Sequence, residues 1–196
     1  MRAFIAIDLS PDVRAALAEA QDRFRKLSPE ARWTRPEGIH LTLKFLGEIS
    51  DAQTKQVVDT LEHLEPFDPF AVEVKGFGFF PGAERPRVFW AGVEAPAALA
   101  ALAAKIERAM ERIGFAREDR AFSPHLTLAR FSVPRPQPSL QAAVAAQGAD
   151  SMGKFEAADF FLFESKLSPQ GAQYRKVRRF PKSDQVRFNA AGEIKP

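Results

Sequence analysis

The tetrapeptide HLTL occurs twice in this chain of 196 residues, at positions 40–43 and 125–128. Only three histidines are present, and two of them, His40 and His125, open these two copies. An imidazole titrates near pH ~6.5, so at neutral pH one ring can accept a proton while another donates one. Two such rings on opposite sides of one phosphorus atom suit in-line displacement, in which one activates water and the other protonates the departing oxygen.

Each of these histidines is followed two positions later by a threonine. Side chains two apart in a strand share a face, so His40 lies beside Thr42 and His125 beside Thr127, while the leucines point the other way. Threonine hydroxyls can donate hydrogen bonds to non-bridging phosphoryl oxygens, where charge builds up in the transition state. This chemistry requires no metal, and no HxxxH, HD or carboxylate cluster in the sequence offers three ligands close together.

The third histidine, His63, serves as an internal control. It stands in TLEHLEPF without the HxT context, and we expect a surface residue near a helix C-terminus. A lone histidine on a strand is more often packed or exposed than catalytic. It is the repetition of HLTL that favours a catalytic pair.

A longer repeat surrounds the two HLTL copies. Residues 1–45 placed on residues 86–130, an offset of 85, pair 16 identical residues without a gap. Ala-rich helices account for part of this identity, but Arg2 on Arg87 and Phe4 on Phe89 are harder to attribute to composition. Each half is therefore predicted to run strand, helix, HxT strand, helix, strand.

Hydrophobic periodicity, caps and turn residues predict alternating strands and helices. Strands are expected at residues 2–9, 38–47, 70–80, 87–93, 125–131, 154–165 and 172–180, and helices at residues 11–27, 51–64, 96–114 and 138–147.

Composition sets broad limits on function. With 28 basic and 25 acidic residues, the net charge is +3. This charge tolerates a phosphate-bearing partner but does not indicate the dense stripe of basic residues that is typical of a nucleic-acid-binding protein. The absence of cysteine excludes disulfides, thiolate metal sites and thiol nucleophiles. The N-terminal apolar run is too short for a signal peptide, and no run approaches the ~20 residues of a membrane span. These features predict a cytoplasmic protein with no membrane association.

HLTLKFLG and HLTLAR together resemble the two motifs of the two-histidine (2H) phosphoesterase superfamily. RAFIAIDL, PRVFWAGV and ESKLSPQGAQY are similar to its RNA 2′,3′-cyclic phosphodiesterase branch, also called 2′-5′ RNA ligases. The resemblance covers residues 1–181 and implies one bilobal, duplicated α+β domain. Two antiparallel-rich sheets would form a concave cleft with helices outside, and residues 182–196 would be a polar tail.

The resemblance also implies an activity: metal-free hydrolysis of RNA 2′,3′-cyclic phosphate ends to 2′-phosphates. His40 and His125 match the catalytic positions, and Thr42 and Thr127 the phosphate-binding ones. By analogy His125 is the base and His40 the acid, although sequence symmetry leaves this direction open. The implied substrate is an RNA end, for example a tRNA half, or a small nucleotide. No cofactor, metal or obligate protein partner is expected, and the protein is expected to be a monomer.

Just past the two HLTL copies, the offset pairs Phe45 with Arg130. Either residue reaches the histidine face only if a bend or bulge interrupts the strand, because the fifth residue from a strand histidine otherwise lies on the opposite face. If both reach it, they could sandwich a terminal base, as the resemblance also implies. Pairing with the substrate phosphate is the rival role for Arg130, and core packing is the alternative for Phe45.

Three other functions remain open. One is a related phosphodiesterase acting on small cyclic nucleotides or 2′-5′ linked oligonucleotides, including reverse 2′-5′ ligation. Another is a non-catalytic RNA-end binding module, and the weakest is a metallohydrolase. Two further features are secondary. The hairpin LSPQGAQY, with Pro169 and Gly171, carries the only tyrosine, Tyr174. The basic run at residues 174–180 is more typical of an edge strand than of a surface that guides RNA phosphates.

Overall fold

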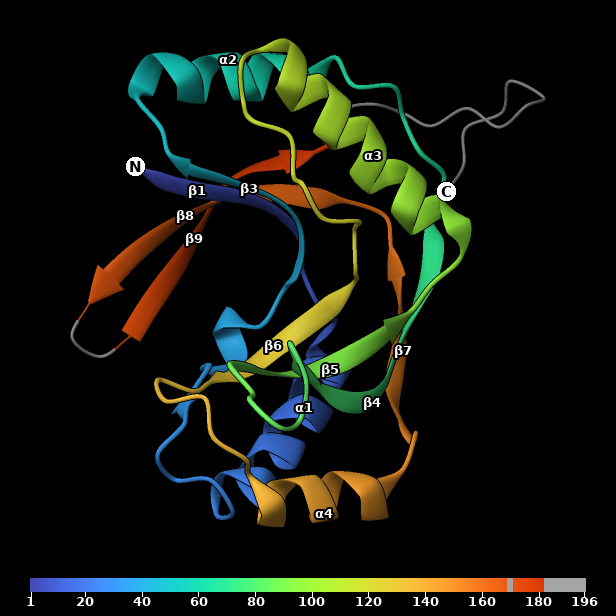
Figure 1. Ribbon diagram of the computed structural model, residues 1–196. Helices are drawn as coiled ribbons and strands as arrows, with labels where there is room; N and C mark the ends of the chain where they lie inside the picture. The colour runs from blue at the N-terminus through green and yellow to red at the C-terminus, as the bar shows by residue number, and fades with distance from the viewer. Residues whose placement is uncertain (169–170, 182–196) are drawn as a thin grey trace.

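The computed structural model describes residues 1–168 and 171–181. Within these residues, two antiparallel sheets and four α-helices form the fold (Figure 1). The first sheet, sheet A, has the strand order β3-β1-β8-β9, and the second, sheet B, the order β2-β6-β5-β4-β7. The strands are β1 (Arg2–Ile7), β2 (Arg32–Trp33), β3 (Leu41–Glu48), β4 (Phe70–Phe80), β5 (Val88–Glu94), β6 (His125–Arg130), β7 (Ser151–Ala157), β8 (Phe160–Ser168) and β9 (Gly171–Phe180).

The helices are α1 (Pro11–Arg25), α2 (Asp51–Glu62), α3 (Ala97–Arg112) and α4 (Pro138–Gln147). Three of them start where the sequence predicts, and α3 starts one residue later than predicted, after Pro96 as its N-cap. Ser10 caps α1, with proline in its first turn. Ser50 and Gln53 form a reciprocal capping box at the start of α2. Local sequence is therefore sufficient to place these helix starts, and the predicted order of strand, helix, HxT strand, helix and strand recurs in both halves.

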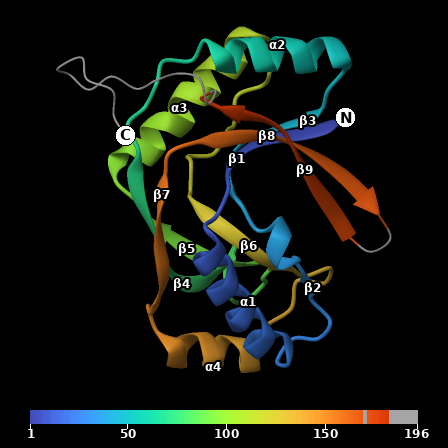
Figure 2. The ribbon, with the colours of Figure 1, turned by 180° about the vertical axis from the view of Figure 1, so that it is seen from behind.

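The first helix of each half, α1 or α3, packs against the sheet that does not contain the strand before it. α1 follows β1 of sheet A but packs against sheet B, where Phe24 meets Phe77 and Phe89 edge-on. α3 follows β5 of sheet B but lies against β3 of sheet A, and α2 lies beside it (Figures 1 and 2). One continuous core thus contains residues of both sheets and all four helices. Each half of the repeat buries apolar surface belonging to the other.

A matching β-bulge interrupts each HxT strand. In β3, Thr42 pairs with Ala6 and Lys44 with the adjacent Ile5, so Leu43 is the extra residue. Leu43 and Lys44 consequently both point into the core, and Phe45 turns back to the face of Thr42.

The bulge in β6 follows the same pattern. Thr127 pairs with Trp90 and Ala129 with the adjacent Phe89, which leaves Leu128 as the extra residue, 85 positions after Leu43. The carbonyl oxygen of Leu128 accepts hydrogen bonds from the buried Gln21 side chain of α1, at 3.0 Å, and from Thr34 N, at 2.8 Å. Arg130 therefore returns to the face of His125 and Thr127.

Two parts of the predicted architecture were wrong. The single strand expected at residues 154–165 is two strands in different sheets, because the chain passes from β7 to β8 at Ala158 and Asp159. The two-residue strand β2 and the short 3₁₀ helix η1 (Pro36–Gly38) were not anticipated. Pro169 and the polar tail at residues 182–196 lie outside the described residues. Within the described chain, no helix is both long and apolar enough to cross a membrane.

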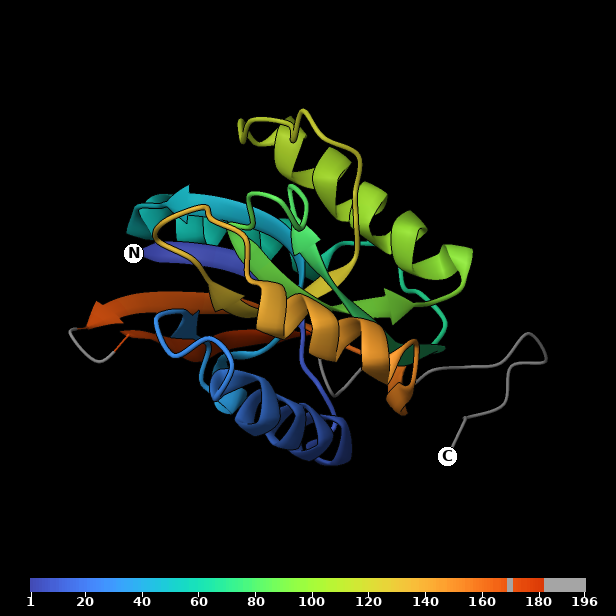
Figure 3. The same ribbon diagram turned by 60° about the horizontal axis from the view of Figure 1, so that its bottom comes forward.

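Helices α1 and α3 lie on opposite sides of the strands (Figure 3). The HxT residues lie on the sheet faces opposite the buried residues that pack against these helices. Lys44, on the opposite side of β3 from Thr42, contacts Glu107 of α3, and Arg178, on the same side of sheet A, contacts Glu62 of α2. Helices α2 and α3 thus cover the face of sheet A opposite Thr42. Residues of β3 and β6 approach each other, with Cα atoms within 8 Å.

Candidate active site

His40 stands directly before β3 and packs among aromatic rings. Its ring stacks on Phe4 with centroids 4.3 Å apart and an interplanar angle of 25°, and the Tyr174 ring meets it edge-on with centroids 5.0 Å apart. Glycine at position 38 leaves room for this ring, because an added Cβ would lie 3.0 Å from the Tyr174 side chain, closer than ordinary van der Waals contact. The imidazole is therefore held in one orientation and partly shielded from water.

The backbone fixes the tautomer of His40. Its Nδ1 lies 2.8 Å from the carbonyl oxygen of Gly38. A carbonyl oxygen only accepts hydrogen bonds, so Nδ1 must carry the proton and donate it. In the neutral ring this leaves the Nε2 lone pair free to accept a proton.

His125 repeats this arrangement in sheet B. Its Nδ1 donates to the carbonyl oxygen of Ser123 at 2.8 Å, again two residues earlier, so its Nε2 is the free nitrogen as well. The Phe80 ring meets it edge-on at 4.9 Å. Because Phe80 is the only ring stacked or packed on it among the described residues, His125 is less enclosed than His40.

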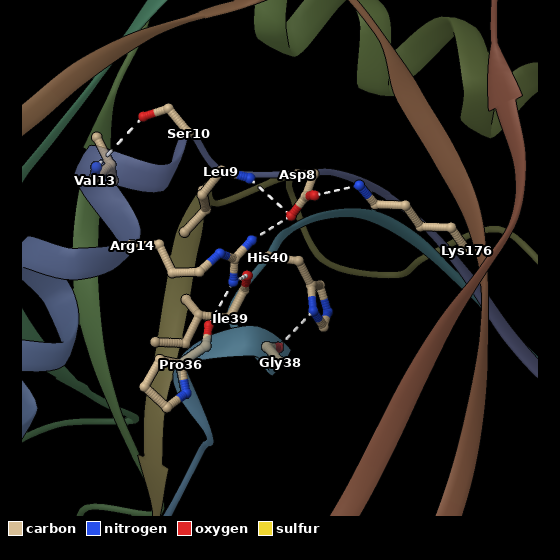
Figure 4. A network of polar contacts seen from close by, with 10 residues as sticks. All are labelled: Asp8, Leu9, Ser10, Val13, Arg14, Pro36, Gly38, Ile39, His40 and Lys176. Carbon is tan, nitrogen blue, oxygen red and sulfur yellow. Dashed lines mark hydrogen bonds and ion pairs between the residues drawn. The ribbon is translucent and has the colours of Figure 1, made fainter.

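A polar network holds the turn that presents His40 (Figure 4). Arg14 of α1 donates to the carbonyl oxygens of Pro36, at 2.5 Å, and Ile39, at 3.1 Å, on either side of Gly38. The same guanidinium pairs with Asp8, and the other Asp8 oxygen lies 2.5 Å from Lys176 of β9. The turn is thus tied to α1, β1 and β9 at once.

Burial lowers the pKa of His40 from its ordinary value of 6.5 to about 4. The hydrogen bond to Gly38 and the charge of Asp8 oppose this effect, whereas the charges of Arg14 and Arg130 add to it. At neutral pH the ring is therefore uncharged. Arg130 belongs to β6, so its field reaches from one HxT strand to the histidine of the other.

The remaining candidate residues lie on the same two faces. Thr42 and Thr127 are half-buried, and each shares a face with its histidine. The two bulges supply the interruption that Phe45 and Arg130 require. The Phe45 side chain is 56 % exposed, with its ring 6.2 Å from that of Phe4, which excludes core packing as its role.

Sequence reasoning missed most of the surroundings of His40. Phe4, Asp8 and Arg14 lie in elements whose predicted role is only that of a scaffold, and the single tyrosine, a minor candidate on sequence grounds, contacts the ring directly. One signal for this network is present in the sequence, because the oppositely charged Asp8 and Arg14 stand six residues apart on either side of the start of α1.

The other features singled out in the sequence lie elsewhere. His63 caps the exposed end of α2, as expected of a surface residue, and borders a groove of about 740 Å³ between α2 and α3. Four cations of β9 pair with acidic residues, which favours the edge-strand interpretation of that run: Arg175 with Glu164, Lys176 with Asp8, Arg178 with Glu62 and Arg179 with Asp159. Among the described residues, no group of three or more His, Asp or Glu side chains is arranged to hold a metal ion.

Comparison with known proteins identifies the class. The family described as LigT like phosphoesterase matches residues 7–90 and 92–174, and the chain belongs to this family. The two matched segments start 85 residues apart (92 − 7 = 85), which equals the offset of the internal repeat.

Individual relatives cover nearly the whole chain. A protein of Archaeoglobus fulgidus named RNA 2′,3′-cyclic phosphodiesterase is 33% identical over 180 residues, 92% of this chain and 99% of its own. One of the same name from Thermus thermophilus is 33% identical over 189 residues, 92% of this chain and 89% of its own.

Solved structures agree with the fold. A crystal structure of a Thermus thermophilus protein superposes with a TM-score of 0.78 at 31% identity, over 92% of this chain and 97% of that one. The structure of E. coli LigT complexed with 3′-AMP gives 0.72 at 25% identity, over 91% of this chain and 96% of that one. The bilobal, antiparallel-rich α+β architecture predicted from the sequence is confirmed.

Proposed function

We propose that this protein hydrolyses RNA 2′,3′-cyclic phosphate ends to 2′-phosphates without a metal, using His40 and His125 as its acid–base pair. One observation carries the proposal. His40 directly precedes β3 and His125 begins β6, and these two strands approach each other; both rings have the same tautomer, fixed by the carbonyl two residues before, and each has a free Nε2. Relatives named for this activity at 33% identity support the choice of substrate.

The burial of His40 favours one direction of proton transfer over the other. A base must begin unprotonated, and a pKa of about 4 gives His40 that state at neutral pH. We therefore assign His40 as the base and His125 as the acid, the reverse of the direction that the family analogy favours.

The reaction then needs no further group. His40 Nε2 takes a proton from water as the oxygen attacks phosphorus, the bond from phosphorus to the 3′ oxygen breaks, and His125 protonates that oxygen. The product carries a 2′-phosphate and a 3′-hydroxyl. The hydroxyls of Thr42 and Thr127 donate to the non-bridging oxygens from the two sheets, and the exposed Phe45 ring stacks on the terminal base.

This assignment predicts that the acidic limb of the pH–rate profile lies at unusually low pH. The kcat/KM of the enzyme should decline only as the pH falls through about 4, because His40 remains unprotonated above that value. Asp8→Asn should move the limb to lower pH, since the Asp8 charge raises the pKa of His40, and Arg14→Met should move it to higher pH. Rate profiles and titration of the His40 ring protons by NMR measure both. Shifts of the same sign in the two variants would contradict the assignment.

The activity itself is tested by product analysis. RNA ending in a 2′,3′-cyclic phosphate should be converted to the 2′-phosphate at a rate unchanged by EDTA. A 3′-phosphate product would mean that the 2′ oxygen leaves instead. Loss of activity in EDTA with recovery on adding a divalent ion would contradict the metal-free reaction.

The same geometry bears on the alternatives. A binding module has no need for two imidazoles fixed in the same tautomer, which favours an enzyme over a non-catalytic RNA-end binder. A monomeric state and a cytoplasmic location remain part of the proposal, and the absence of cysteine is compatible with a reducing compartment.

A further inference from the structure

Two arginines lie side by side at the edge of sheet B. Arg32 of β2 is the direct cross-strand partner of Arg130 of β6. Directly opposed residues of an antiparallel pair point to the same face, and the next pair, Trp33 with Ala129, points into the core, where Trp33 meets Phe89. Arg32 therefore shares the face of His125 and Thr127.

Placing Arg32 opposite Arg130 lowers the stability of the folded state, and no ion pair in the described part of the chain compensates for it. Like charges directly opposite each other across a ladder repel. Both side chains are exposed, and within residues 1–168 and 171–181 neither forms an ion pair with a carboxylate. The nearest acidic residue in sequence, Glu30, pairs with Arg135 instead. By contrast, four neighbouring cations of β9 in sheet A are all matched with acids.

Arg32 and Arg130 also lie near enough to His125 to contact the same bound nucleotide. On β5, the partner strand, Val88 opposite Arg130 and Gly92 opposite His125 are four residues apart, about 13 Å at 3.3 Å per residue. The Arg130 side chain shortens this span, since its charge acts on His40.

We propose that Arg32 and Arg130 together bind the phosphodiester on the 5′ side of the terminal nucleotide, so that the preferred substrate is an oligonucleotide or a 5′-phosphorylated nucleotide. Guanidinium groups bind phosphate oxygens through paired, charge-assisted hydrogen bonds, and two of them side by side match its oxygens and charge. This inference rests on the proposed function for the identity of the nucleic acid. It assigns Arg130 to a phosphate and leaves base stacking to Phe45.

The test compares two substrates that differ only in the proposed ligand. Adenosine 2′,3′-cyclic phosphate is supplied with a 5′-hydroxyl or with a 5′-phosphate. Arg32→Gln should lower kcat/KM for the 5′-phosphorylated substrate by about 10- to 100-fold, through KM, and leave the 5′-hydroxyl substrate unchanged. Arg108→Gln, an exposed arginine of α3 in the groove beside α2, removes the same charge elsewhere and should affect neither.

A binding measurement keeps this inference separate from the catalytic one. Affinity for a short single-stranded RNA is measured against salt concentration, and Arg32→Gln should reduce the slope of log K by about 0.7 for one lost phosphate contact. An unchanged slope, or equal losses on both cyclic substrates, would overturn the phosphate site. Normal RNA binding and slope without hydrolysis by the wild-type protein would instead contradict the proposed function.

Discussion

Replacing His125 with asparagine should lower kcat for cyclic phosphate hydrolysis by about 10²- to 10⁴-fold, the range of a lost general acid. His40→Asn should cause a loss of similar size, because the attacking water then has no base. Both side chains have a fixed tautomer and a free Nε2, so the loss is expected in kcat more than in KM. Single-turnover rates on a short RNA with a cyclic end measure the effect.

The third histidine provides the matched control. His63→Asn changes an exposed helix end and should leave kcat unchanged. Urea unfolding of each variant separates a catalytic loss from misfolding, which matters for His40 because its ring stacks on Phe4. Full turnover by either His40→Asn or His125→Asn would remove the acid–base pair as the mechanism.

Lys44→Ala should reduce the free energy of unfolding by about 3–5 kcal/mol, the cost of breaking a buried ion pair. The Lys44 side chain is 1 % exposed, and its Nζ lies 2.7 Å from Glu107 Oε1 and 2.9 Å from the carbonyl oxygen of Ala116. Glu107 also accepts a hydrogen bond from the backbone of Glu118. Removing the lysine leaves the Glu107 carboxylate, which is largely shielded from water, without its positive partner. It also removes the hydrogen bond to Ala116 in the loop that leads to β6.

Urea denaturation measures this change, with Lys55→Ala on the exposed face of α2 as the control, expected within about 0.5 kcal/mol of wild type. The double variant Lys44→Met with Glu107→Leu should recover much of the loss, because it removes both charges together. A decrease below about 1 kcal/mol for Lys44→Ala would mean that the pair is already well hydrated.

Much of the fold follows from local sequence. The caps at Ser10 and Ser50 and the period of each helix are short-range signals, and so is the alternation that puts His40 with Thr42. The break between β7 and β8 is different, because Ala158 and Asp159 include neither glycine nor proline and Asp159 alone is a weak signal for a break. Tertiary pairing decides that break, as the two flanking strands join different sheets.

The site could be predicted only in part for a similar reason. The HLTL repeat identifies the histidines, but nothing in LTLKF or LTLAR marks Leu43 or Leu128 as an extra residue. The bulges depend on which residues the neighbouring strands β1 and β5 offer, and only those registers bring Phe45 and Arg130 to the catalytic faces. The buried Gln21 and Lys44 beside the bulges look like ordinary polar surface positions in the sequence.

Bulges at equivalent positions of the two halves have a consequence for the origin of the molecule. One insertion copied by gene duplication explains both more simply than two separate events. The two bulges bring unlike residues to equivalent positions, an aromatic ring at Phe45 and a cation at Arg130. A molecule lying between the two HxT strands would therefore meet different chemistry on its two sides, although the backbone of the two halves is similar.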